Sequence, residues 1–152
     1  MSTDPVELLR SLLAANWVAA NTDSVAPFTA DSGIDGRKVS GSQKRITVKA
    51  YRGQPVTMQK VGHSGAFYTR EDRVTLDINI FPPAPAGTLR THMEKVMDEA
   101  RRVIETKRIN PDAFWDWMMF EGFSMPVEFE DGLKTTGTVM FRAIWKAMAA
   151  LA

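Results

Sequence analysis

The sequence contains no cysteine, which excludes disulfide bonds and thiolate metal sites. An excess of either charge is also missing: 19 basic residues oppose 18 acidic ones, whereas a domain that binds nucleic acid normally carries a clear basic excess. No apolar run approaches the roughly 20 residues that span a membrane, and the N-terminal stretch lacks the basic region that opens a signal peptide. We therefore expect a soluble protein, with no membrane partner, assembled in a reducing compartment.

The composition is otherwise that of an ordinary globular protein, with 44% hydrophobic and 24% charged residues, and 152 residues suit one domain. Two helices are predicted. Asp4 and Pro5 have the capping pattern of a helix start, and apolar residues at helical spacing continue to about residue 20. A second apolar stripe predicts a helix over residues 88–108. The Gly-, Ser- and Asp-rich stretch at about 21–43 predicts a mobile surface loop.

Alternating apolar and polar residues predict a set of strands. They cover residues 44–51, 56–61, 66–70, 73–81, 123–130 and 133–146. Asp131-Gly132 is a two-residue hairpin signal between the last two strands. Residues 111–121 fit a short helix or a strand, and residues 137–151 also fit helical spacing, so both alternatives stay open. This order of elements predicts an α+β fold: a mostly antiparallel sheet packed against two helices in a single domain, residues 1–152.

The stretch from Arg73 to Ile80 divides its side chains by polarity. Successive side chains of a strand point to opposite faces of the sheet. Val74, Leu76, Ile78 and Ile80 should therefore face the helices. Arg73, Thr75, Asp77 and Asn79 should lie together on the other face. The role of that polar face is open at this point: it could meet solvent, a ligand or another copy of the chain.

Catalytic patterns are sparse. His63 and His92 are the two histidines, and neither lies in the pattern that a Ser–His hydrolase or a zinc site needs. Residues 31–36 resemble part of a calcium loop that lacks its final bidentate Glu. We therefore predict no catalytic residue, no metal site and no cofactor. A small ligand-binding or hydrolytic α+β enzyme, with its site near His63, stays open as the alternative from another class.

The densest apolar cluster lies between two chain breakers. Its central members are Trp115, Trp117, Met118 and Met119. Core packing is one interpretation of this cluster. Contact with a partner is the other, because aromatic residues and Met are enriched at protein interfaces.

Five segments, in their order along the chain, carry a family resemblance: VELLRSLLAA, KRITVKAYRG, AFYTREDRVTLDINIFP, LRTHMEKVMDEARRVIE and TVMFRAIWKAM. This order resembles the tail terminator, or tail completion, proteins of phages with long non-contractile tails, and related head–tail connector subunits. The resemblance implies a structural virion protein, not an enzyme, that forms a ring, typically a homohexamer. Such a ring caps the tail tube, ends its elongation and presents a surface to the head. A head-side neck connector or stopper is the alternative within the same class.

The resemblance also implies partners and a location. The partners are further copies of the chain, the tail tube protein and head–tail connector proteins, while DNA passes through the lumen without sequence-specific binding. The location is the tail or neck of the virion, after assembly in the host cytoplasm. The candidate ring-interface or lumen surface consists of Arg45, Lys49, Arg70, Arg73, Asp77 and Asn79. Reversing the charges of Arg70 and Arg73 is expected to block ring formation without unfolding the subunit.

Overall fold

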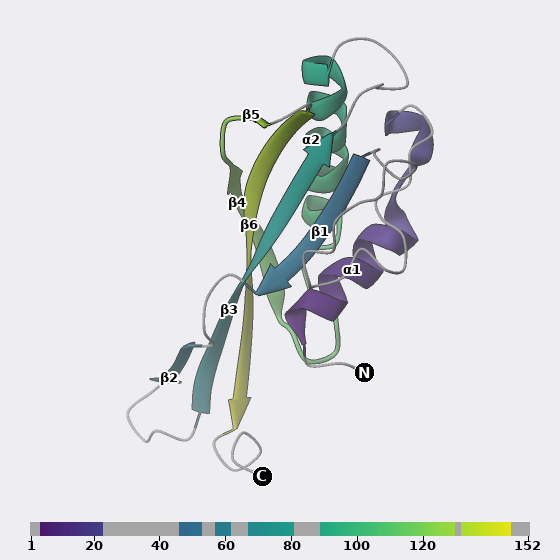
Figure 1. The fold of residues 1–152 in the computed structure, drawn as a ribbon. Helices are drawn as coiled ribbons and strands as arrows, with labels where there is room; N and C mark the ends of the chain where they lie inside the picture. Colours follow the sequence, from purple (N-terminus) through teal and green to yellow (C-terminus); the bar gives the residue numbers. More distant parts are fainter. Residues whose placement is uncertain are drawn as a thin grey trace.

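The sheet and its two helices form the α+β arrangement predicted from the sequence (Figure 1). The computed structural model describes residues 4–22, 46–52, 57–61, 67–80, 89–129 and 132–146. The helices are α1 (Pro5–Asn16), the short 3-10 helix η1 (Ala19–Thr22) and α2 (Leu89–Thr106). The strands are β1 (Ile46–Arg52), β2 (Thr57–Val61), β3 (Phe67–Ile80), β4 (Trp117–Phe123), β5 (Val127–Phe129) and β6 (Gly132–Lys146). The predicted loop at about 21–43 lies, from residue 23 onward, outside the described residues.

All strand pairings are antiparallel, and the main path through the sheet runs β1-β3-β6-β4. β1 and β2 follow one another along one edge of β3, and β5 and β4 do the same along the far edge of β6. Both helices cover the same face of this sheet, with α1 against β1 and β3 and α2 against β3, β4 and β6 (Figure 1). Among the described residues, no helix lies on the other face.

The first helix begins as predicted and ends earlier than predicted. Asp4 caps it by accepting a hydrogen bond from the Val6 backbone N–H (3.0 Å), and Pro5 occupies the first helical position. The helix ends at Asn16 instead of continuing to residue 20. Beyond it the backbone N–H of Val18 donates to the Glu99 carboxylate of α2 (2.6 Å), which draws the chain out of the helical path.

The core lies between the helices and the sheet. Its members from the helices include Leu9, Leu13, Met93, Val96, Ala100, Val103 and Ile104. The sheet contributes Val74, Leu76, Ile78 and Ile80 from β3, and Val139, Phe141 and Ala143 from β6. The apolar face predicted for residues 74–80 is therefore the buried one.

Strand β3 is a single strand of 14 residues, where the sequence predicted two shorter strands. It pairs with β6 over its whole length, from Phe67 opposite Lys146 to Ile80 opposite Leu133, which gives a ladder roughly 45 Å long. This pairing also settles the prediction for residues 133–146 in favour of a strand. In Figure 1 one end of the ladder extends beyond both helices. We call this end the arm; it comprises β2, residues 67–71 of β3 and residues 142–146 of β6.

The predicted strand over residues 123–130 is in fact divided between β4 and β5. Ser124 ends β4 by donating its backbone N–H to the Thr136 carbonyl (2.8 Å), and Pro126 cannot donate to a ladder. A bulge between Phe120 and Gly122 bends β4, and Gly122 has a φ of 148°, which favours glycine. β5 then pairs with the start of β6, as the hairpin signal predicted.

Candidate protein-interaction surface

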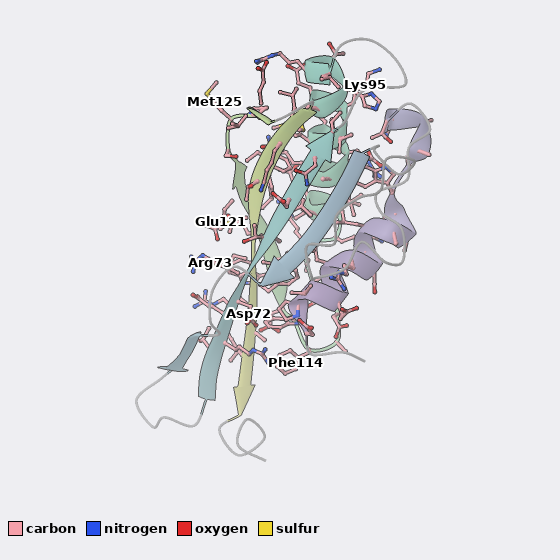
Figure 2. All side chains as sticks on the ribbon, in the orientation of Figure 1. Asp72, Arg73, Lys95, Phe114, Glu121 and Met125 are labelled. Carbon is pink, nitrogen blue, oxygen red and sulfur yellow. The ribbon has the colours of Figure 1, made fainter. Side chains whose placement is uncertain are left out.

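The face of the sheet without helices is the candidate functional surface, and we call it the open face. It carries the odd-numbered residues of β3 from Thr69 to Asn79, the even-numbered residues of β6 from Lys134 to Ile144, and Trp117, Met119 and Glu121 of β4. Figure 2 shows Arg73 and Glu121 on the side of the sheet away from the helices.

Ion pairs between strands connect the charged side chains of the open face. Arg73 lies 3.0 Å from Glu121, which it reaches across β6. The other two pairs are Arg142–Glu71 (3.5 Å) and Lys134–Asp77 (3.5 Å). Asp77 also accepts a hydrogen bond from the Thr136 hydroxyl (3.0 Å). Because each cation in these pairs has its own carboxylate, this set of side chains has no surplus charge with which to attract a polyanion.

Apolar side chains lie among these ion pairs. Met119 is 46% exposed and Ile144 is 53% exposed, while Trp117 and Met140 are half-buried. Met119 and Met140 are direct neighbours in the β4–β6 register. The Arg142 guanidinium lies 5.9 Å from the centre of the Trp117 ring. Trp, Met and Arg are the residues that are enriched at protein interfaces, and large apolar side chains exposed together mark binding surfaces.

The structure places only part of the predicted surface on the open face. Arg73, Asp77 and Asn79 lie there, although Asp77 is largely buried beneath its partners. Lys49 is opposite Asp77 in the β1–β3 register, so its position belongs to the same face. Arg45 lies outside the described residues.

Arg70 is a correction to the prediction, because it lies on the helix-covered face. Its Nε atom is 3.0 Å from the Oδ2 atom of Asp72, a residue that is 1% exposed. The guanidinium also lies over the rings of Phe114 (5.6 Å) and Trp115 (5.1 Å). Arg70 and Arg73 are three residues apart, an odd separation that puts them on opposite faces of one strand. Reversing the charge of Arg70 would place two carboxylates together inside the fold, so we now expect that change to disturb folding.

The predicted partner-contact cluster is divided between the two faces. Trp115 and Met118 are 1% exposed and belong to the core, and the Trp115 ring makes an edge contact with Phe141 at 5.6 Å. Their burial removes them from the candidate surface. Trp117 and Met119 point the other way and stay on the open face.

A second exposed apolar site was missed by the sequence analysis. Met125 is 80% exposed and Val127 is 63% exposed, at the turn between β4 and β5 (Figure 2). We call residues 124–128 the tip. Alternation alone predicted one continuous strand there, and Pro126 was the signal that could have located the break.

One buried carboxylate lies away from the open face and is held by hydrogen bonds within the fold. Glu99 of α2 is 2% exposed and accepts hydrogen bonds from Arg102 (2.7 and 2.9 Å), Val18 (2.6 Å) and Asn21 (2.8 Å). The Arg102 hydrogen bonds lower the pKa of Glu99 most, burial opposes them, and Val18 and Asn21 lower it further, so the pKa falls from 4.5 to about 2. A carboxylate with so low a pKa and with donors on both oxygens is a weak base, so we assign Glu99 a structural role.

The metal-site and histidine patterns considered from the sequence lie partly in the described part of the chain. Those residues contain no group of three His, Cys, Asp or Glu side chains placed to hold a metal ion. They also include no helix long and apolar enough to cross a membrane. His92 is buried in α2, and His63 lies outside the described residues.

A comparison of the chain with protein-family models and with curated proteins finds no match. The resemblance to tail terminators therefore stays a prediction, and the properties of the open face are the observations that bear on function.

Proposed function

We propose that the protein is a structural subunit of a phage virion that forms a ring, as a tail terminator that caps the tail tube, ends its elongation and presents a surface to the head. The observation that carries the proposal is the open face, where exposed Met119 and Ile144 lie among ion pairs that neutralise one another. This combination of an apolar centre with paired charges around it is typical of a surface that packs against protein.

The charge balance favours a contact between subunits rather than a surface that binds DNA. A groove that holds nucleic acid presents unpaired Lys and Arg to the phosphates. On the open face Arg73, Arg142 and Lys134 each have a carboxylate within 3.5 Å. Where these three ion pairs lie, the face can approach a second protein surface without electrostatic repulsion, and DNA could still pass through such a ring without being held.

The partners in this proposal are further copies of the chain, the tail tube protein and head–tail connector proteins, at the tail or neck of the virion. A head-side connector or stopper would use the same face in the same way. A tail terminator and a head-side connector differ in the protein that they bind. Binding of the purified protein to the tail tube protein or to head–tail connector proteins would therefore distinguish them.

Negative-stain electron microscopy and mass photometry over a range of concentrations test the proposal. We expect closed rings from the wild-type protein. We expect Met119→Lys to raise the concentration needed for rings at least tenfold, because it puts an unpaired charge at the centre of the apolar patch. Val18→Lys is the matched control, since Val18 is 44% exposed on the helix side and Met119 is 46% exposed on the open face.

Two outcomes would contradict the proposal in different ways. Equal ring formation by Met119→Lys, Val18→Lys and the wild type would show that the open face is not the contact surface. Monomers at every concentration, for all three proteins, would refute assembly of rings by the protein alone. Circular dichroism of each variant would check that the fold is retained.

A further inference from the structure

Strand β6 has a partner on one side only where it runs into the arm. β3 pairs with β6 up to Lys146, whereas β4 pairs with it only up to Arg142. Among the described residues, no strand pairs with residues 143–146 of β6 on the side where β4 lies. We call this stretch the arm edge. A sheet edge of this kind presents backbone N–H and C=O groups to which a strand of another molecule can add.

The side chain of Asp116, the residue before β4, binds the first donor of the arm edge. Its Oδ2 atom accepts a hydrogen bond from the backbone N–H of Ile144 (2.9 Å). The backbone N–H of Asp116 also donates to the Arg142 carbonyl (2.9 Å), which holds the residue beside β6. The carboxylate thus accepts the hydrogen bond that a carbonyl of an added strand would accept. Asp116 is itself exposed, so its charge stays in contact with water while it holds this bond.

The partner that fits the arm edge is the same edge of a second copy. The N–H and the C=O of one strand residue point to the same edge, and two residues opposite each other in an antiparallel ladder can exchange both hydrogen bonds. Ile144 of one copy can therefore pair with Ile144 of another about a twofold axis. The two side chains, each 53% exposed in the single subunit, would then lie side by side on one face and shield each other from water.

We propose that Asp116 guards the arm edge: its carboxylate binds the Ile144 N–H and so keeps two copies from joining through this edge into one continuous sheet. A second strand can pair with Ile144 only after the carboxylate has released that N–H, so the guard reduces what pairing gains. The guard acts within a single subunit and does not depend on the proposed function. In a subunit that assembles through another surface, it suppresses a competing contact.

Disulfide cross-linking at residue 144 measures this edge-to-edge contact, and the chain has no cysteine of its own. Two residues that exchange both hydrogen bonds have Cα atoms about 5.5 Å apart, a separation that suits a disulfide. Ile144→Cys is made alone and in combination with Asp116→Ala or Asp116→Asn, and each protein is oxidised and run on a non-reducing gel. We expect at least tenfold more dimer when Asp116→Ala is present. Asp116→Asn should give no increase, because its amide oxygen can still accept the bond.

Asp112→Ala in the Ile144→Cys background is the matched control. Asp112 lies in the same connection between α2 and β4, and its Oδ1 atom also accepts a backbone hydrogen bond, from Phe114 (3.0 Å). That bond lies within the connection and leaves the Ile144 N–H untouched. The control should therefore give the dimer yield of Ile144→Cys alone.

Hydrogen exchange tests the guard in the unaltered protein, so the test does not depend on a variant that folds. The Ile144 amide of the wild type should exchange at least tenfold more slowly than the same amide in a short unstructured peptide, although no described strand pairs with it. Exchange at the peptide rate would show that the carboxylate does not hold this N–H, and would overturn the inference.

The cross-linking outcomes are equally decisive. Equal dimer yields with and without Asp116→Ala overturn the inference. An increase of the same size with Asp112→Ala also overturns it, because the cause would then be a general loosening of the connection. An equal increase with Asp116→Asn overturns it by assigning the effect to charge instead of the hydrogen bond. None of these results depends on whether the wild type forms rings, so this inference and the proposed function can fail separately.

Discussion

Replacing Glu99 by Gln should remove the buried charge through which α2 binds the segment that follows α1. Both Glu99 oxygens accept hydrogen bonds, from the Arg102 guanidinium, the Val18 backbone N–H and the Asn21 amide. Arg102 also donates to the Asn16 carbonyl at the end of α1 (2.7 Å). Gln has nearly the same shape but no charge, and its NH2 group would face donors at one of the two oxygen positions. The variant therefore keeps the packing and loses the electrostatics.

The magnitude follows from the pKa of Glu99. Lowering that pKa from 4.5 to about 2 corresponds to roughly 3 kcal/mol of stability, since each pKa unit is worth about 1.4 kcal/mol. We expect Glu99→Gln to lower the free energy of unfolding at pH 7 by roughly 3 kcal/mol.

The pH dependence gives the sharper test. Because the pKa of Glu99 is lower in the folded protein than in the unfolded chain, its stabilising effect is complete above pH 4.5 and is lost as the pH falls toward 2. The difference in free energy of unfolding between the wild type and Glu99→Gln should therefore be constant from pH 7 to about 5 and shrink below 4.5. Urea unfolding, followed by tryptophan fluorescence at a series of pH values, measures that difference directly.

Glu105→Gln is the matched control, because Glu105 pairs with Arg101 on the solvent-exposed side of the same helix. That variant should unfold at the same urea concentration as the wild type. If Glu99→Gln matches the wild type at pH 7, or if the gap between them persists unchanged at pH 2, the assigned role of Glu99 is wrong.

Three further changes should have distinct effects. Gly137→Ala should destabilise the protein by about 1–3 kcal/mol in urea unfolding, because a Cβ at this position would lie 2.8 Å from the ring of Phe123 and the ring would have to move; an unchanged midpoint would show that the ring moves without cost. Arg70→Met should cost about 2–4 kcal/mol, because it removes the cation beside the buried carboxylate of Asp72, and retained stability in urea unfolding would contradict this. Asp4→Ala should lower the free energy of unfolding by about 1 kcal/mol, because α1 loses its cap. Thermal unfolding followed by circular dichroism measures this loss, and an unchanged midpoint temperature would show that the cap is dispensable.

The fold was predictable wherever the pattern was local. The alternation at residues 74–80 identified which side of β3 is buried, and the apolar stripe of α2 predicted that helix within two residues at each end. The continuity of β3 was not predictable in the same way. Asp72 interrupts the apolar face, and its contact with Arg70, whose guanidinium lies over the rings of residues 114 and 115, makes a charged pair tolerable there.

The candidate surface was less predictable, because it depends on which strands become neighbours. Glu121 was not among the predicted surface residues, and it reaches Arg73 only because β6 lies between β3 and β4. Glu99 illustrates the same limit: Arg102 lies three residues away on the same helix, but Val18 and Asn21, which also donate hydrogen bonds to this carboxylate, are far away in the sequence. The cause in each case is a partner distant in sequence, which periodicity does not reveal.

The pairing of β3 with β6 sets the order in which this chain can fold. β3 joins β1 and β2 through short connections, but its longest partner, β6, is synthesised after α2 and β4. At roughly 5–20 residues per second, the edge of β3 that pairs with β6 stays unpaired for several seconds during synthesis. Contacts so distant in sequence also slow refolding of the complete chain. The central ladder that gives the subunit its length is thus also the part of the fold most exposed to aggregation during synthesis.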